Sequence, residues 1–218
     1  MKTLYILRHG QTEWNVDKRM QGHMDSPLTD KGKQQVNAHG KTLKALGGID
    51  QLFVSPSGRT RETAYILNSY TKAAMTFESA LMERDCGEWS GQLLSDVEAR
   101  YPQAWRAREE DAFEHRPPGG ENLRDMQERV GDFIRSLFAV DCDVVGLVTH
   151  GVMSRVILMQ LLGLNAKEAL RVYHPNDAFY RLSFHPAEIE THHFKDGAGP
   201  QAGLLRHTQA ETIASRRK

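Results

Sequence analysis

Short apolar runs and longer amphipathic segments alternate along most of the chain. Thr3–Leu7, Gln51–Val54 and Val144–Val148 are short and mainly apolar. Each is followed by polar or glycine residues, a pattern typical of a strand buried on both faces. We therefore predict a strand from each run, and two later strands at Phe179–Phe184 and Glu190–Phe194.

The segments between these runs have the spacing of amphipathic helices. Asn122 opens the most regular one, with Asp125 placed three residues later to complete a cap. Turn residues at Ser55–Gly58 and a glycine pair at Gly47-Gly48 mark where other helices begin or end. The predicted helices run from about Asp30 to Leu46, from the Ser55–Gly58 turn through Leu67, from Asn122 to Leu137 and from Val152 to Leu162.

Strands that alternate with helices indicate an α/β fold. We expect three layers, α/β/α, with a mostly parallel central sheet and helices on both faces. Prolines and dense charge interrupt residues 93–120, and we interpret this stretch as a small helical lid inserted over a site. The prediction is a single domain over residues 1–195, followed by a polar tail over 196–218 that includes a basic end at 215–218.

Composition adds little beyond excluding some classes. The chain has 218 residues, 28 basic and 28 acidic side chains, and 39% hydrophobic residues, as in ordinary globular proteins. The balanced charge argues against nucleic acid as a partner, and no apolar run is long enough for a membrane span. Cys86 and Cys142 are too few for a disulfide framework, so a reducing, cytoplasmic location is expected.

Two histidines and two arginines follow the predicted strands. Arg8 and His9 follow the first strand, Arg59 follows the second, and His150 follows the strand at Val144–Val148. Ligands of open α/β sheets bind beyond the carboxyl ends of the strands. Because arginine matches phosphate oxygens with two parallel N–H groups, this edge would suit a tetrahedral anion.

Each of these residues also has an ordinary structural interpretation. A single histidine after a strand is usually a hydrogen-bonded structural residue, and a lone Arg8 or Arg59 is usually an ion-pair partner or a solvated helix residue. Their joint placement at one edge favours a site, but spacing alone does not choose its chemistry.

Five motifs follow one another along the chain. They are Leu7-Arg8-His9-Gly10-Gln11-Thr12-Glu13-Trp14-Asn15, then Gln21-Gly22 with Asp25 and Pro27-Leu28-Thr29, then Ser55-Pro56 with Arg59 and Thr63-Ala64, then Glu83-Arg84 with Gly87-Glu88-Trp89, and Thr149-His150-Gly151. In this order they resemble the motifs of the histidine phosphatase superfamily, also called phosphoglycerate-mutase-like. The resemblance extends from the first strand to about residue 180, where Asn176 stands at the position of a late asparagine.

The resemblance implies roles for particular residues. His9 would be the nucleophile that becomes phosphorylated, and Glu83 would be the proton donor to the leaving group. Arg8, Arg59 and His150 would bind the phosphoryl oxygens. The lesser phosphate or substrate contacts would be Asn15, Gln21, Gly22 and Gly151. The implied reaction needs no metal and no cofactor.

Other polar residues are weaker candidates for a role in the site. Glu88 is the second carboxylate of the glutamate loop, and its position in the motif matches the family's proton donor less well than that of Glu83. Glu121 opens a helix, where a structural role is favoured. His192 and His193 are adjacent on a predicted strand and therefore face opposite ways, which argues against a shared metal. His23 lies in a loop where substrate contact and plain solvation are equally good accounts.

The family contains phosphatases, cofactor-dependent mutases and members that only bind. The stretch from Asp111 to Glu121 lacks the longer insertion of the mutases, so the resemblance favours a phosphatase acting on a small phosphomonoester. A phosphoglycerate mutase, which would use the same phosphohistidine chemistry, is the alternative enzyme. A non-catalytic binding module is the alternative that is not an enzyme. It is disfavoured because His9, Arg8, Arg59 and His150 are all present. Neither the substrate nor the oligomeric state can be predicted from the sequence.

Overall fold

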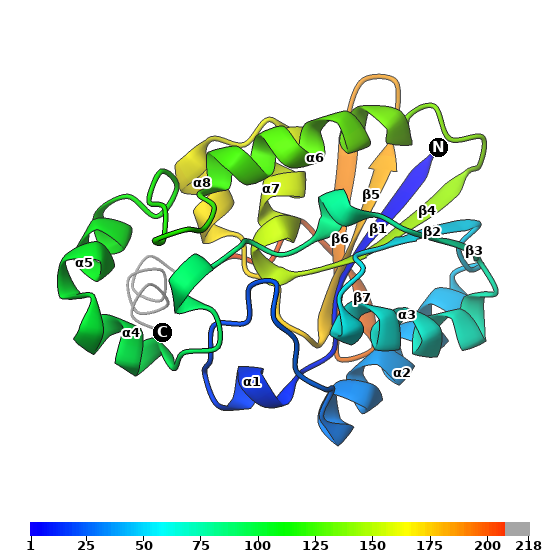
Figure 1. Cartoon of the computed structure of the whole chain (residues 1–218). Helices are drawn as coiled ribbons and strands as arrows, with labels where there is room; N and C mark the ends of the chain where they lie inside the picture. The colour runs from blue at the N-terminus through cyan, green and yellow to red at the C-terminus, as the bar shows by residue number, and fades with distance from the viewer. Residues whose placement is uncertain (208–218) are drawn as a thin grey trace.

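The computed structural model describes residues 1–207, and its centre is a sheet with the order β3-β2-β4-β1-β5-β6-β7 (Figure 1). Four neighbouring strands, β3 to β1 in that order, run parallel, while β5, β6 and β7 continue the sheet in antiparallel pairs. The strands are β1 Thr3–Arg8, β2 Gln51–Val54, β3 Ala74–Phe77, β4 Val144–Thr149, β5 Ala178–Phe184, β6 Ile189–Lys195 and β7 Ala198–Ala202.

Helices cover both faces of the sheet, as predicted (Figure 1). One layer contains α2 Asp30–Ala45 and α3 Gly58–Thr71, and the other contains α6 Leu123–Leu137, α7 Gly151–Leu162 and α8 Ala166–Arg171. The α/β/α architecture with a mostly parallel sheet core is therefore confirmed. Among the described residues, no helix is long and apolar enough to cross a membrane.

Each face of the sheet has its own hydrophobic core. Leu4 and Ile6 of β1 pack with α6 and α7 on one face, and Leu7 packs with α2 and α3 on the other. This division follows from the alternation of side chains along a strand. Complete burial of each such side chain contributes roughly 1.5–3 kcal/mol. The two cores fix both helix layers against β1 and β4, the strands that carry His9 and His150.

The register of β1 and β4 places the two histidines together. Arg8 pairs with Thr149 in the parallel ladder, so the chain leaves both strands at the same level of the sheet. The His9 N–H also donates to the Thr149 oxygen at 3.1 Å, which extends the ladder by one residue. His9 and His150 are thus the first residues beyond two adjacent strands.

Glycines allow the start of α2 to press against the loop that follows His9. A Cβ atom at Gly32 would lie 2.1 Å from the Gln11 oxygen, and one at Gly10 would lie 2.6 Å from the Gly32 oxygen. Any larger residue would force these backbones apart. The Thr29 side chain also accepts a hydrogen bond from Gly32 N at 3.0 Å and so caps α2. The His9 loop is therefore held by the α2 layer.

Short helices form the predicted lid region. They are α4 Leu94–Arg100 and α5 Pro102–Glu110, accompanied by η2 Gly87–Trp89. A small separate core of Met20, Cys86, Trp89, Val97 and Trp105 joins them to the loop after β1. The remaining short elements are α1 Glu13–Val16 and η1 Ser79–Leu81.

The sequence does not predict several of the short elements, among them α8, β3 and β7. The helix α8 and the strand β3 are too short for a clear period, and β3 is mostly exposed. The strand β7 lies within the expected polar tail, yet it pairs with β6, and Arg206 forms a bridge with Val172. Backbone pairing therefore extends the ordered domain beyond residue 195 without an apolar pattern. The predicted basic end at 215–218 lies outside the described residues.

Candidate functional site

His9 presents one ring nitrogen for chemistry. Its Nδ1 lies 2.8 Å from the Gly10 carbonyl oxygen, which can only accept a hydrogen bond. Nδ1 therefore carries the hydrogen, and the lone pair of the neutral ring is on Nε2. Burial, then the positive charges of Arg59 and Arg8, hold the pKa of His9 well below its usual value. His9 is therefore neutral at pH 7, as a nitrogen nucleophile must be.

His150 faces His9 across the site. The two ring centroids are 5.3 Å apart at an interplanar angle of 63°. His150 Nε2 lies 2.8 Å from Ser55 Oγ, whereas its buried Nδ1 has no hydrogen-bond partner among the described residues. Burial, followed by the positive charge of Arg59, lowers the pKa of His150. Its Nδ1 is thus available for an oxygen of a bound group.

Arg59 is 1% exposed and is fixed by the loop that follows α1. Its Nη1 donates to the Met24 oxygen at 2.7 Å and to Asp25 Oδ1 at 2.9 Å, and its Nη2 donates to the Gly22 oxygen at 2.9 Å. Its Nε is buried without a partner in the described part of the chain. A guanidinium has five N–H groups, so capacity remains for an anion.

Arg8 lies at the end of β1 and contacts the first residue of α7. Its Nη1 donates to the His174 oxygen at 2.8 Å, and a Cβ atom on Gly151 would lie 3.2 Å from its Cζ. The missing side chain at Gly151 therefore lets the guanidinium approach the helix N-terminus. Burial lowers the pKa of Arg8 to about 10, and the nearby Glu83 charge opposes this shift, so Arg8 stays charged at neutral pH.

Glu83 reaches the same helix N-terminus. Its Oε2 accepts from Val152 N at 3.1 Å, and its Oε1 accepts from Met153 N at 3.1 Å and from Arg84 N at 3.0 Å. Helix N-termini favour negative charge, which accounts for this placement. The carboxyl group is therefore held beside Arg8 and the start of α7.

The lesser predicted contacts mainly shape the loop around the nucleophile. Asn15 Oδ1 accepts from Thr12 N at 3.0 Å and caps α1, and Gln21 Nε2 donates to Thr12 Oγ1 at 2.9 Å. Gly22 has a positive φ of 53° and offers its oxygen to Arg59. Gln21 Oε1 is buried without a partner among the described residues. Gln21 is therefore the one of these three residues whose side chain has a buried polar atom without a described partner.

The alternative acidic candidates lie in other surroundings. Glu88 is exposed. Glu121 accepts from Asp85 N at 3.0 Å and forms an ion pair with Arg129 at 2.9 Å, a structural role that joins the glutamate loop to α6.

The cysteine of the glutamate loop, Cys86, is buried. Burial raises the pKa of its thiol, so the thiolate, which is the form that is readily oxidised, is disfavoured.

The other histidines make separate contacts. His192 Nδ1 is 3.2 Å from Arg181 Nη2, whereas His193 contacts Gly203 and Gln201. His23 Nε2 lies 2.9 Å from the main-chain oxygen of Glu83, so this loop histidine is next to the glutamate backbone. Within residues 1–207, no group of three histidine, cysteine or acidic side chains has the arrangement of a metal site.

Sequence reasoning missed the part played by His174 and gave no role to Asn176. His174 is 1% exposed, its Nδ1 lies 2.9 Å from Ser154 Oγ, and its own main-chain oxygen accepts from Arg8. Asn176 Nδ2 donates to the His9 oxygen at 2.8 Å. Both residues precede β5, the antiparallel neighbour of β1. Their proximity to the site depends on that long-range pairing, which no local sequence pattern predicts.

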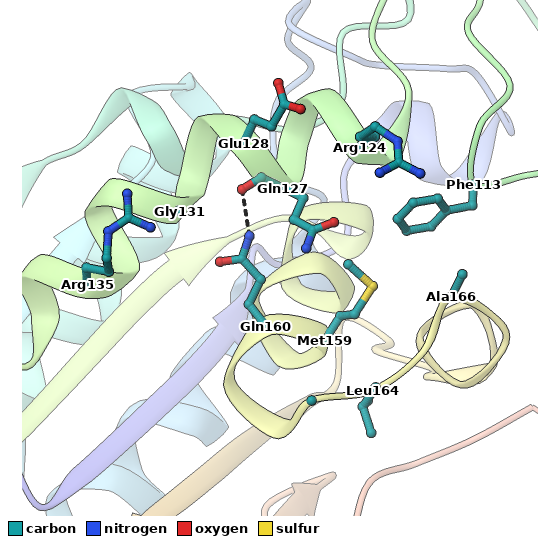
Figure 2. Close-up of a pocket in the computed structure, with 11 residues that line it drawn as sticks. Phe113, Arg124, Gln127, Glu128, Gly131, Arg135, Met159, Gln160, Leu164 and Ala166 are labelled. Carbon is teal, nitrogen blue, oxygen red and sulfur yellow. Dashed lines mark hydrogen bonds between the residues drawn. The ribbon is translucent and has the colours of Figure 1, made fainter.

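The wide groove between α6 and α7 is a separate feature (Figure 2). Gln160 Nε2 donates to the Gln127 oxygen at 2.6 Å and ties the two helices together across it. Met159 and Leu164 contribute apolar surface. None of the predicted site residues lines this groove. The groove is therefore separate from the predicted site, whose histidines follow the carboxyl ends of β1 and β4.

Groups suited to binding a tetrahedral dianion meet beyond the ends of β1 and β4. Arg8, Arg59 and His150 can donate hydrogen bonds, and the first turn of α7 adds a helix N-terminus. His9 lies next to His150, with 5.3 Å between the ring centroids. The resemblance predicted Arg8, His9, Arg59 and His150 from three separate motifs, and the fold brings them together.

Comparison with known proteins gives a consistent result. The family model described as histidine phosphatase superfamily (branch 1) matches residues 4–197. A protein of Salmonella paratyphi B (strain ATCC BAA-1250 / SPB7) named probable phosphoglycerate mutase GpmB is 31% identical over 190 residues, which cover 86% of this chain and 87% of that protein.

Solved structures are similar over most of the chain. A mycobacterial glucosyl-3-phosphoglycerate phosphatase in complex with VO3 is 28% identical, with a TM-score of 0.78 over 91% of this chain and 100% of that one. A putative alpha-ribazole-5'-P phosphatase from Escherichia coli str. K-12 substr. MG1655 has a TM-score of 0.80 over 94% of this chain and 96% of that one. At 20% identity, the second likeness concerns the fold alone.

Proposed function

The chain belongs to the histidine phosphatase superfamily, and we propose that it hydrolyses a small phosphomonoester through a phosphohistidine intermediate at His9. The observation that carries this proposal is the hydrogen bond from His9 Nδ1 to Gly10 O, since it leaves the Nε2 lone pair of a neutral ring free. We further propose that the enzyme acts in the cytoplasm, without metal or cofactor.

In the first half-reaction, His9 Nε2 attacks the phosphorus as the ester P–O bond breaks. Arg8, Arg59 and His150 stabilise the charge that spreads over the three equatorial oxygens. Glu83, in its protonated form, gives its proton to the departing alkoxide. Such general acid assistance is worth about 10²–10⁴-fold in rate. The products of this step are the free alcohol and a phosphoryl group on His9.

In the second half-reaction, water attacks the phosphoryl group in line with the N–P bond. The Glu83 carboxylate accepts a proton from that water, and the electron pair of the N–P bond returns to His9. Inorganic phosphate then leaves, and both Glu83 and His9 regain their starting protonation states. The arginines supply the positive charge that a metal would supply in other phosphatases.

A mutase is the second candidate, favoured by the 31% identity to a protein named probable phosphoglycerate mutase. A mutase would pass the phosphoryl group from His9 to a second hydroxyl instead of to water. The solved phosphatase at 28% identity favours hydrolysis and makes phosphorylated three-carbon acids and sugar phosphates the first substrates to test. Binding without catalysis would not require a neutral His9 with a free ring nitrogen, so a non-catalytic binding module is disfavoured.

A phosphate-release screen tests the proposal. Wild type, His9→Ala and the exposed control His185→Ala are assayed on aryl and alkyl phosphomonoesters in excess chelator. We expect release by wild type and the control, and none by His9→Ala. Interconversion of phosphoglycerates by primed wild type, without phosphate release, would identify a mutase. If the wild type shows neither phosphate release nor interconversion, the proposal that the protein is an enzyme is overturned. Loss of activity in chelator would overturn the proposal that no metal is needed.

A further inference from the structure

His174 is a buried histidine to which the proposed reaction assigns no role. It is 1% exposed, it precedes β5, and its ring centroid is 4.6 Å from that of Tyr180. Packing in the hydrophobic core would account for its burial. It would not account for the hydrogen bonds of the ring, which an apolar side chain of the same size would lack.

Both ring nitrogens of His174 have a partner within hydrogen-bond distance. Nε2 lies 3.1 Å from the main-chain oxygen of Ala178, which can only accept, so Nε2 carries a hydrogen. Nδ1 lies 2.9 Å from Ser154 Oγ. Burial, then the positive charge of Arg8, holds the pKa of His174 well below its usual value. The neutral ring therefore donates to Ala178 and accepts from the Ser154 hydroxyl.

These two hydrogen bonds join different elements of the fold. Ser154 is fully buried in the first turn of α7, and its N–H donates to the His150 oxygen at 3.0 Å. Ala178 is the first residue of β5, the antiparallel neighbour of β1. The ring of His174 therefore connects α7 to the start of β5. We call Ser154, His174 and Ala178 the His174 bridge.

Arg8 contacts both of the segments that the bridge joins. Its Nη1 donates to the main-chain oxygen of His174 at 2.8 Å. Its Cζ would lie 3.2 Å from a Cβ atom on Gly151, the first residue of α7. Gly151 and Ser154 are three residues apart, a spacing that places them on one side of the helix. The bridge thus fixes the backbone oxygen that holds Arg8 relative to the helix turn beside it.

The segment that begins at His174 also contacts the nucleophile. Asn176 Nδ2 donates to the His9 main-chain oxygen at 2.8 Å. Pro175 separates His174 from Asn176, and its ring restricts the backbone at that point because it fixes φ. A displacement of His174 would therefore move groups that hold both Arg8 and His9.

We propose that the His174 side chain is a positioning group for Arg8, because its bonds to Ser154 and Ala178 fix the main-chain oxygen that holds the Arg8 guanidinium. The inference rests on the proposed function, in which Arg8 stabilises the equatorial oxygens of the phosphoryl group. An arginine side chain has many rotamers, so a fixed acceptor keeps its N–H groups aimed at those oxygens. A misplacement of about 1 Å can cost about 10²-fold in rate.

Single variants test whether the bridge affects the reaction. His174→Leu removes both ring nitrogens and should lower kcat/KM on p-nitrophenyl phosphate by about 10- to 100-fold. Ser154→Ala removes one of the two bonds and should have a smaller effect of the same kind. The matched control is His193→Leu, since His193 is 8% exposed and bonded to Gly203 and Gln201. It should keep the wild-type kcat/KM. Wild-type kinetics in both bridge variants would overturn the inference.

Double-mutant cycles distinguish positioning of Arg8 from a general loss of structure. When His174→Leu is combined with Arg8→Lys, the loss of kcat/KM should be at least about threefold smaller than the product of the two single losses. When it is combined with Arg59→Lys, the losses should multiply to within about twofold. Arg59 is the control because the loop after α1 holds its guanidinium. Equal coupling of His174 to both arginines would contradict a specific role at Arg8.

A second variant covers failure to fold. If circular dichroism shows that His174→Leu is unfolded, both cycles are run with Ser154→Ala, which breaks the same bridge from α7. Coupling to Arg8 but not to Arg59 is again the expected result, and losses that multiply in both cycles would overturn the inference.

The outcome for this inference is separable from that for the proposed function. If wild type hydrolyses p-nitrophenyl phosphate through His9 but the Arg8 cycle is multiplicative, the phosphatase stands and the role of His174 is wrong. If no phosphomonoester is hydrolysed, the proposed function is wrong. The same cycles, measured as the Kd of inorganic phosphate by titration calorimetry, then decide whether His174 supports Arg8.

Discussion

Asp25 holds Arg59 at two points. Its carboxylate accepts from the Arg59 backbone N–H at 3.2 Å and from Nη1 at 2.9 Å, so the start of α3 and the guanidinium are fixed by one side chain. Arg59 is almost fully buried, whereas the Asp25 side chain is 39% exposed. The loop after α1 thus positions Arg59, the arginine of α3 that we propose binds phosphate.

We expect Asp25→Ala to reduce kcat/KM by about 10- to 100-fold, mainly through KM, because a charge-assisted hydrogen bond contributes about 1.5–3 kcal/mol. Steady-state kinetics on p-nitrophenyl phosphate measures the effect. The control is Asp17→Ala, which removes an exposed carboxylate near Arg19. Equal kinetics for the Asp25 and Asp17 variants would show that Arg59 needs no such support.

A methyl group at Gly58 should have a related effect. A Cβ atom there would lie 2.0 Å from Asp25 Oδ2, so Gly58→Ala must displace the carboxylate that holds Arg59. We expect a loss of phosphatase activity of about tenfold or more, from the same interaction energy.

Gly131→Ala in α6 is the matched control for Gly58→Ala. Its nearest described neighbour, Arg135 Nη1, would be 3.5 Å from the new Cβ atom. This substitution should leave activity unchanged and raise stability by up to about 1 kcal/mol, since alanine favours helix. Activity of Gly58→Ala equal to that of Gly131→Ala would contradict the clash.

Glu83→Gln should slow the enzyme according to the leaving group. Alkyl phosphates need a proton on the departing oxygen and should lose about 10²–10⁴-fold, whereas p-nitrophenyl phosphate, with its stable leaving group, should lose far less in the phosphorylation step. Single-turnover kinetics isolates that step. The exposed Glu88→Gln serves as control. Equal losses on alkyl and aryl phosphates would argue against Glu83 as the general acid.

Buried histidines should make the fold sensitive to acid. Burial lowers the pKa of His39, a residue of α2 that is 2% exposed and whose ring contacts that of Phe179. Between that lowered pKa and about 6.5, the unfolded chain binds a proton that the folded chain does not. The free energy of unfolding should therefore decrease as pH falls below about 6.5.

His39→Gln isolates this contribution. The slope of unfolding free energy against pH, measured by urea denaturation between about pH 6.5 and 5, should become shallower by up to about 1.4 kcal/mol per pH unit. The exposed His185→Gln should keep the wild-type slope. A slope in His39→Gln as steep as that of wild type would contradict neutral burial of His39.

The strands that carry the site could be predicted because they are apolar on both faces. The predicted strand Val144–Val148 differs from β4 by one residue, and Gln51–Val54 matches β2. Since parallel strands end at one edge, the residues after them could be expected to meet there. The capping pair Asn122 and Asp125 likewise located the start of α6.

The rest depends on contacts between distant segments. The strand β7 has no apolar pattern, and its place follows from pairing with β6. His174 and Asn176 reach the site because β5 runs antiparallel beside β1.

Trapping the phosphorylated enzyme tests whether His9 is the nucleophile. Wild type and His9→Ala are mixed with a phosphomonoester that the wild type hydrolyses, quenched in base, where phosphohistidine survives, and mapped by mass spectrometry. We expect one phosphoryl group on His9 of the wild type, formed and lost at rates that match turnover, and none in His9→Ala. Turnover by wild type without label on His9, or turnover by His9→Ala, would contradict it.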